Sequence, residues 1–143
     1  ADRGKLDVLQ PYVGRVGGFT EARKVGEIAA QRGLDIVPHC WKTGIGIAAS
    51  AHFAAATECC RYIEFVPANL CQSVLRQELV ADELTMVDGV IPLPEKPGLG
   101  IELNRDALAR YAAEAERMAA AREAKPSPPA PHFSPAKSPA TRA

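Results

Sequence analysis

The sequence lacks the features that mark several large classes of protein. Its 17 basic and 17 acidic residues cancel and form no long run of one sign, so charge gives no case for nucleic acid or a membrane surface as partner. No apolar run approaches the roughly 18 residues that span a bilayer, and no charged-then-apolar secretory leader opens the chain. These absences predict a soluble, cytoplasmic protein and leave a small neutral or acidic ligand as its partner.

The four cysteines lack the spacing of a zinc site or of a disulfide framework. No CxxC pair occurs, and Cys59 and Cys60 are adjacent, so we expect reduced thiols in a cytosolic protein. The acidic residues are scattered over the expected helices and loops. We therefore assign no residue of this chain to a metal.

Composition divides the chain into three parts. Residues 1–83 carry alternating strand and helix patterns, residues 84–123 hold two short apolar runs and a last helix, and residues 124–143 are rich in Pro, Ser and Ala. The third part has too little apolar surface to offset the entropy of ordering, so we expect a disordered tail. The chain begins without Met and reaches a strand after a few residues, which indicates a piece of a larger protein.

Short apolar runs alternate with amphipathic segments in the first part. The predicted strands are Asp7–Gln10, Asp35–Val37 and Arg61–Val66. Helices are expected between Thr20 and Gly33 and from about Ile45 to Thr57, while residues 12–18 are expected to form a glycine-rich loop. Short strands separated by helices of about 10 to 15 residues are typical of parallel βαβ units. The predicted fold class is α/β.

A hairpin and two helical segments are predicted after the third strand. Residues 73–80 are expected to form a helical turn or two, and Asp88-Gly89 between two apolar runs is a strong hairpin signal. Asn104 is a candidate N-cap for the last helix. The apolar face of that helix consists of Leu108, Tyr111, Ala112, Ala115 and Met118.

Side chains suited to acid–base chemistry lie at the ends of the three predicted strands. Tyr12 follows the first strand, His39 follows the second, and Glu64 lies in the third. In parallel α/β sheets, ligands bind at the carboxyl ends of strands, where the βα loops converge. A histidine there can act as a general acid or base, and a carboxylic acid can donate a hydrogen bond to a developing oxyanion. A purely structural role stays open for each residue.

Other polar residues are weaker candidates. Trp41 and Lys42 lie on the loop after His39, where they contact either a substrate or solvent. His52 lies inside an alanine-rich helix, which indicates a packed or surface histidine. His132 lies in the tail and receives no role.

Four motifs follow one another between about residue 5 and about residue 111. They are LQPYVGRVGGFTEARKVGEIAAQRGLDIVPH, GIGIAASAHFAAA, YIEF and DGVIPLPEKPGLGIELN. In this order they resemble the carboxyl-terminal part of the mandelate racemase and muconate lactonizing enzyme family, the mandelate racemase-like branch of the enolase superfamily. The resemblance implies a TIM barrel with a capping domain, in which the three strands are the sixth to eighth and the hairpin segment returns to the cap.

The resemblance also implies an activity and roles for the strand-end residues. In such enzymes a divalent metal, usually Mg²⁺, holds the substrate carboxylate, a base removes the adjacent proton, and an enediolate is stabilised until it is reprotonated or expels a leaving group. Acid sugars are the common substrates. His39 matches the family's general acid/base, and Glu64 matches its electrophile. The family's metal ligands and its lysine base lie on earlier strands, so the resemblance places them outside this chain.

Tyr12 occupies the position at which the resemblance implies an aspartate partner for the histidine. A phenol can hydrogen-bond an imidazole, but as a neutral group it does not stabilise imidazolium as a carboxylate does. This departure favours a dehydratase or cycloisomerase, hence a lyase or isomerase, over a two-base racemase. The alternative is a catalytically incompetent fragment, or a binding-only remnant without the metal site. The family also tends towards symmetric homo-oligomers.

Overall fold

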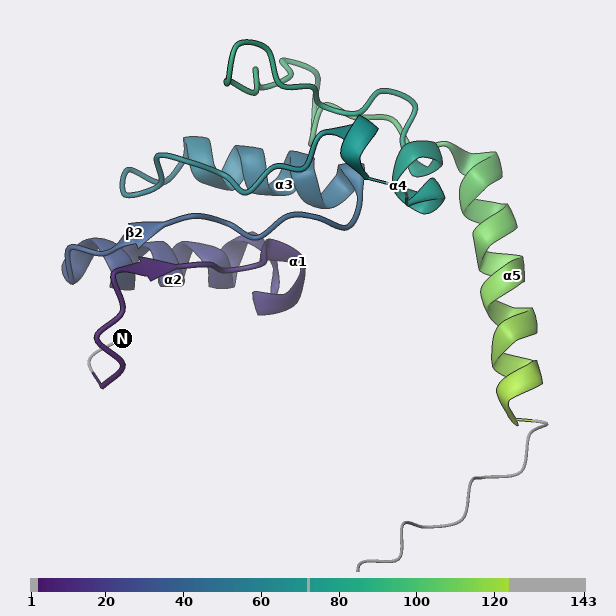
Figure 1. Cartoon of the computed structure of the whole chain (residues 1–143), viewed down its shortest axis with the longest axis horizontal. Helices are drawn as coiled ribbons and strands as arrows, with labels where there is room; N and C mark the ends of the chain where they lie inside the picture. The colour runs from purple at the N-terminus through teal and green to yellow at the C-terminus, as the bar shows by residue number, and fades with distance from the viewer. Residues whose placement is uncertain (1–2, 72, 124–143) are drawn as a thin grey trace, which may run out of the picture.

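A computed structural model describes residues 3–71 and 73–123 of the chain (Figure 1). Its elements are β1 (Val8–Leu9), α1 (Val13–Val16), α2 (Gly18–Gln31), β2 (Asp35–Ile36), α3 (Gly44–Ala55), the 3₁₀ helix η1 (Ala68–Leu70), α4 (Val74–Leu79) and α5 (Arg105–Glu123). The tail predicted for residues 124–143 lies outside the described residues. Within residues 3–71 and 73–123, every helix is too short or too polar to cross a membrane.

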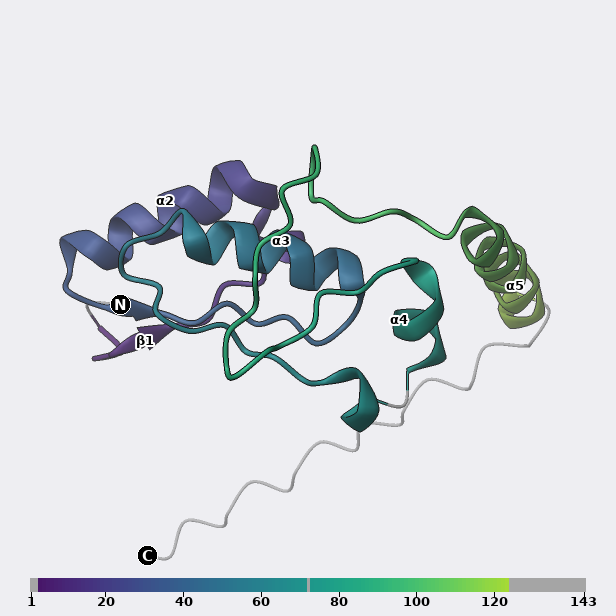
Figure 2. The same cartoon turned by 90° about the horizontal axis from the view of Figure 1, so that it is seen from above.

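The two strands form the parallel pair that the sequence predicts. Val8 lies opposite Asp35 and Leu9 opposite Ile36. Two parallel neighbours need a long crossover connection, which α1 and α2 supply. Helices α2 and α3 pack against each other on the same side of the strands (Figure 2). This arrangement confirms the α/β class and places the carboxyl ends of both strands at one edge.

The third predicted strand, Arg61–Val66, differs from the prediction. Only one parallel β-bridge, between Ile36 and Cys60, extends the pair in the described chain. The Glu64 amide does donate to the carbonyl of Pro38, at 3.2 Å. Pro38 has no N–H to return a hydrogen bond, so a regular ladder is interrupted at this point. The segment therefore follows β2 as an extended chain, and the expectation of three complete βα units is not confirmed.

The segment expected to be a loop between the first strand and the first long helix contains a helical turn instead. The Tyr12 carbonyl accepts from the amides of Arg15 and Val16, at 2.8 and 3.0 Å, which closes α1. Gly17 then turns the chain with φ of 109°, in the left-handed region that glycine tolerates. As a result α2 begins at Gly18, before the predicted start after Thr20.

The core lies between the strands and the helices. Ile36 of β2 and Phe53 of α3 are at most 1% exposed, and full burial of such side chains contributes about 1.5–3 kcal/mol each. Ala22 and Ala29 of α2 are fully buried. Their small side chains allow α2 to approach the strands closely, so the two alanines belong to the same buried cluster as Ile36 and Phe53.

The predicted hairpin turn is present. Val87 and Val90 form an antiparallel bridge, and Asp88 and Gly89 both have positive φ, 49° and 80°. Positive φ at both central residues is typical of type I′ turns, whose twist matches that of the flanking strands. The chain then returns to the residues that follow α4, where the Ala81 amide donates to the backbone carbonyl of Glu102 at 2.9 Å.

Helix α5 begins where the sequence predicts, but its predicted apolar face is not buried. The Asn104 side chain accepts from the Ala107 amide at 3.1 Å, which is an N-cap bond. Ala107 is 1% exposed, whereas Leu108 is 45% and Met118 62% exposed. The helix projects away from the strands in both views (Figures 1 and 2). Helix α4 packs against α5, and most of the predicted apolar face is exposed in the described chain.

Candidate active site

Backbone hydrogen bonds bring the three predicted strand ends together. The His39 amide donates to the Pro11 carbonyl, and the Glu64 amide donates to the Pro38 carbonyl, each at 3.2 Å. Tyr12 follows Pro11 directly, so all three candidate side chains come from adjacent stretches of extended chain. This convergence follows from parallel pairing, because the carboxyl ends of parallel strands lie at the same edge of a sheet.

His39 and Glu64 are in direct contact. The imidazole Nδ1 forms a hydrogen bond with Glu64 Oε2. The side chains are 37% and 27% exposed, respectively, so the pair is accessible from outside. Because Nδ1 is occupied, Nε2 is the ring nitrogen available to a ligand.

Two aromatic rings flank the imidazole. Tyr12 meets His39 edge-to-face, with centroids 5.9 Å apart and an interplanar angle of 80°. Trp41 lies on the loop after His39, with centroids 5.2 Å apart and planes tilted by 47°. Lys42 is exposed on the same loop. The structure thus brings Tyr12 and Trp41 to His39 and leaves Lys42 in solvent.

Glycines make room for the Tyr12 ring, a feature that the sequence analysis missed. A Cβ at Gly46, in the first turn of α3, would lie 3.3 Å from the Tyr12 hydroxyl oxygen. A Cβ at Gly14 would lie 3.4 Å from the ring. Thr43 caps the same helix by accepting from the Gly46 amide at 3.2 Å. The phenol is therefore held beside the N-terminus of α3.

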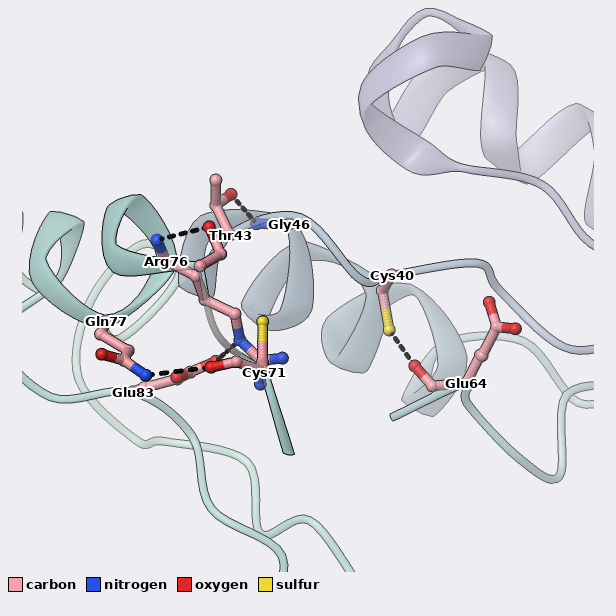
Figure 3. A network of polar contacts seen from close by, with 9 residues as sticks. Cys40, Thr43, Gly46, Glu64, Cys71, Arg76, Gln77 and Glu83 are labelled. Carbon is pink, nitrogen blue, oxygen red and sulfur yellow. Dashed lines mark hydrogen bonds and ion pairs between the residues drawn. The ribbon is translucent and has the colours of Figure 1, made fainter. Parts of the chain in front are cut away.

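Cys40 is a further residue that the sequence analysis did not single out. Its thiol is fully buried and donates to the Glu64 carbonyl (Figure 3). Burial, reinforced by the Glu64 carboxyl group and opposed by Ser50 and Arg76, raises the Cys40 pKa to about 11. The thiol is protonated at neutral pH, so it acts as a donor that joins two strand ends. The only sign of a role for Cys40 in the sequence was its position next to the candidate histidine His39.

Behind the strand ends lies a buried ion pair. Arg76 of α4 is 0% exposed and donates through Nε to Glu83, at 2.6 Å (Figure 3). Its guanidinium carbon lies 5.9 Å from the centroid of Phe65, next to Glu64 in the chain. Within the described residues, both terminal nitrogens of Arg76 are buried without a hydrogen-bond partner. No motif in the sequence marks this arginine.

The described residues do not fit a magnesium site. They contain no group of three or more His, Cys, Asp or Glu side chains that could hold a metal ion. Mg²⁺ prefers an octahedral set of oxygen ligands, and the strand ends offer one carboxyl group, Glu64, which is already bonded to His39. A second histidine, His52, lies apart, with Nε2 3.3 Å from the Leu99 carbonyl oxygen.

A parallel βαβ arrangement with acid–base side chains at the strand ends defines a class, the α/β proteins that carry their chemistry at the carboxyl edge of the sheet. Comparison with known proteins gives the particular family. Residues 1–107 match the family model described as enolase C-terminal domain-like. The chain therefore belongs to this family, within the mandelate racemase and muconate lactonizing group of the enolase superfamily. The resemblance stated above is confirmed.

Known relatives include cycloisomerases and dehydratases named for sugar acids or their lactones and a muconate cycloisomerase. D-galactarolactone cycloisomerase of Agrobacterium fabrum is 40% identical over 113 residues, which cover 76% of this chain and 30% of the relative. D-xylonate dehydratase of Haloferax volcanii is 32% identical over 113 residues, covering 79% and 27%. The crystal structure of 3,6-anhydro-D-galactonate cycloisomerase from Zobellia galactanivorans superposes with a TM-score of 0.68 and 31% identity, covering 77% and 30%. The chain thus spans under a third of these relatives' length.

Proposed function

We propose that the chain is the carboxyl-terminal part of an acid-sugar dehydratase or cycloisomerase that removes the proton alpha to a carboxylate. The observation that carries the proposal is the His39–Glu64 pair at the strand ends, in a chain whose relatives include such dehydratases and cycloisomerases. Removal of a carbon-bound proton needs a positioned base and stabilisation of the resulting negative charge.

His39 is the proposed acid/base. An imidazole can take or give a proton near neutral pH, and with Nδ1 bonded to Glu64 the transfer falls to Nε2. The rings of Tyr12 and Trp41 both lie against the imidazole. They restrict its rotation, which favours one orientation towards a substrate carbon.

Two different roles can be proposed for Glu64. The family resemblance implies an electrophile, which would donate a hydrogen bond to the developing oxyanion and must be protonated to do so. The contact with Nδ1 of His39 suits an ionised carboxylate that orients the imidazole instead. Because one carboxyl group cannot be both in one step, the two roles lead to different experiments.

Trp41 and Lys42 are the proposed substrate contacts. Trp41 is 50% exposed beside His39, where an indole can pack against the apolar face of a sugar. The Lys42 ammonium group on the same loop can attract the carboxylate of an acid sugar. No step of the reaction is assigned to a metal, because the described residues do not fit a magnesium site.

Turnover tests the proposal directly. The complete enzyme that is proposed to contain this chain is incubated with Mg²⁺ and a panel of acid sugars that includes D-xylonate and D-galactonate, and 2-keto acid formation or lactone isomerisation is followed by NMR. We expect one member of the panel to be consumed, and His39→Ala to abolish consumption. His52→Gln, which keeps a donor for the Leu99 carbonyl, is the matched control. Activity that survives in His39→Ala would remove this residue from the mechanism.

A second candidate function is a binding-only remnant, or a catalytically incompetent fragment. It is favoured by the missing metal cluster in the described residues and by apolar side chains exposed near the sheet edge, with Leu6 48% and Val8 44% exposed. The binding-only remnant predicts that calorimetry detects acid-sugar binding while no product forms. The incompetent fragment predicts neither binding nor product. An exposed edge also favours self-association, so light scattering tests the proposed homo-oligomer in the same samples.

A further inference from the structure

We infer that Glu64 is a positioning residue: its ionised carboxylate accepts from Nδ1–H of His39 and fixes the imidazole in the tautomer whose Nε2 carries the lone pair. The catalytic consequence rests on the proposed function, whereas the tautomer itself does not. This assignment selects the positioning role of Glu64 over the electrophilic role implied by the family.

Three contacts tie Glu64 to consecutive residues around His39. The Glu64 amide donates to the Pro38 carbonyl at 3.2 Å, the Glu64 carbonyl accepts from the Cys40 thiol, and the Glu64 carboxyl group contacts the imidazole between them. The amide bond and the thiol bond thus fix the Glu64 backbone on both sides of His39. From this fixed backbone the Glu64 side chain reaches Nδ1.

The shared proton belongs on the imidazole. Imidazole is a stronger base than a carboxylate in ordinary surroundings, and the Glu64 side chain is 27% exposed, so water still solvates its charge. Nδ1 is therefore the donor and Oε2 the acceptor.

Tyr12 does not occupy the place of a hydrogen-bonded partner. Its ring meets the imidazole edge-to-face with centroids 5.9 Å apart, and its hydroxyl lies beside Gly46 at the start of α3. The carboxylate that orients His39 thus comes from the third strand end. With Nδ1–H held in this way, Nε2 is a base, and the negative charge on Glu64 stabilises the imidazolium that forms when Nε2 takes a proton.

Nitrogen-15 NMR of the labelled full chain tests the assignment without any need for turnover. Spectra are recorded at about pH 8.5, where ordinary imidazoles are neutral, and the signals of His39 are assigned from their loss in His39→Asn. We expect a protonated Nδ1 and a lone pair on Nε2. His52 is the internal control with the opposite pattern, because its Nε2 must donate to the Leu99 carbonyl.

Variants distinguish the loss of a partner of His39 from a general disturbance of the fold. Glu64→Leu is expected to give averaged ring-nitrogen signals for His39 while His52 stays unchanged, and Tyr12→Phe is expected to keep the wild-type pattern. If Glu64→Leu does not fold, the wild-type spectrum alone decides. A protonated Nε2 and a lone pair on Nδ1 in wild-type His39 would overturn the inference, since Nδ1 would then have no proton to donate to the Glu64 carboxylate.

Kinetics give a second readout when a substrate has been found. Glu64→Gln is expected to lower kcat by about 10²–10⁴-fold, the usual range for general acid–base catalysis, with little change in KM; because an electrophile would give the same loss, the tautomer measurement is what separates the two roles. A rise in KM with kcat unchanged would show direct substrate contact and contradict the positioning role. If no acid sugar is turned over, the proposed function fails while the tautomer measurement still stands or falls by itself.

Discussion

The His39–Glu64 pair and the Arg76–Glu83 pair are similar in composition and opposite in setting. Each joins a basic side chain to a glutamate near the strand ends. The side chains of the first are 37% and 27% exposed, and those of the second are 0% and 14% exposed. A partly exposed pair can exchange protons with a ligand, whereas a buried pair that loses one partner leaves a costly unpaired charge. The comparison separates residues suited to chemistry from residues that hold the chain together.

The two pairs are also connected. Arg76 lies against the Phe65 ring, and both Arg76 and Glu64 act on the buried Cys40 thiol between them. Figure 3 shows Cys40 joined to Glu64, and Arg76 joined to Glu83. The buried pair therefore packs against the segment that carries Glu64. We expect loss of the buried pair to lower mainly the stability of the chain, and loss of the His39–Glu64 pair to lower mainly the activity.

Removal of Glu83 should have the largest effect on stability. Glu83→Leu leaves the buried Arg76 guanidinium without its carboxylate, which we expect to lower the free energy of unfolding by about 3–5 kcal/mol. Urea unfolding followed by circular dichroism measures the loss. The double variant R76M/E83L should recover most of it, because apolar replacements remove the buried charge altogether.

An exposed pair provides the control for that experiment. Lys24 and Glu21 bond at 2.7 Å on α2, with side chains 60% and 46% exposed. Lys24→Ala should cost roughly 0.2–1 kcal/mol, as is usual for exposed pairs. A Glu83→Leu loss no larger than that of Lys24→Ala would show that Arg76 finds another partner or reaches water.

Two glycines in the first turn of α3 allow the packing around a buried residue and the packing at the site to be compared, with smaller expected losses of stability. A Cβ at Gly44 would lie 2.5 Å from Cγ2 of the buried Val80, so we expect Gly44→Ala to cost about 1–3 kcal/mol through overpacking. A Cβ at Gly46 would lie 3.3 Å from the Tyr12 hydroxyl, which can shift slightly. Gly46→Ala should therefore cost less than Gly44→Ala in urea unfolding. Equal costs would mean that Tyr12 is packed as rigidly as Val80.

The smallest expected effect is a pH dependence that arises at Cys40. Burial raises its pKa from 9.0 to about 11, so the folded state binds this proton more tightly than the unfolded state. The associated stability is fully present below pH 9 and is lost as pH rises towards about 11. Urea unfolding over this interval should show a shallower decline in Cys40→Ala than in wild type. Identical slopes would show that the thiol ionises as freely in the folded chain as in the unfolded one.

Much of the local structure could be predicted because it depends on neighbouring residues. Asp88-Gly89 forms the expected turn since both positions tolerate positive φ, and Asn104 caps α5 with its own side chain. The placement of His39 and Glu64 at one edge was also predictable, because parallel strands align their carboxyl ends. Helix α5 marks the limit: its apolar face is evident in the sequence, yet Leu108 and Met118 are exposed because a face is buried only where a partner packs on it.

The amino-acid sequence by itself determined the α/β class, the family and the identity of the strand-end side chains, all of which are encoded in local patterns and their order. Only the tertiary structure decided which of those side chains contact one another. Glu64 rather than Tyr12 bonds to Nδ1 of His39, and Arg76 is buried on Glu83. The physical reason is that such pairings depend on distances between segments far apart in the chain, which backbone register and packing set and spacing along the sequence does not.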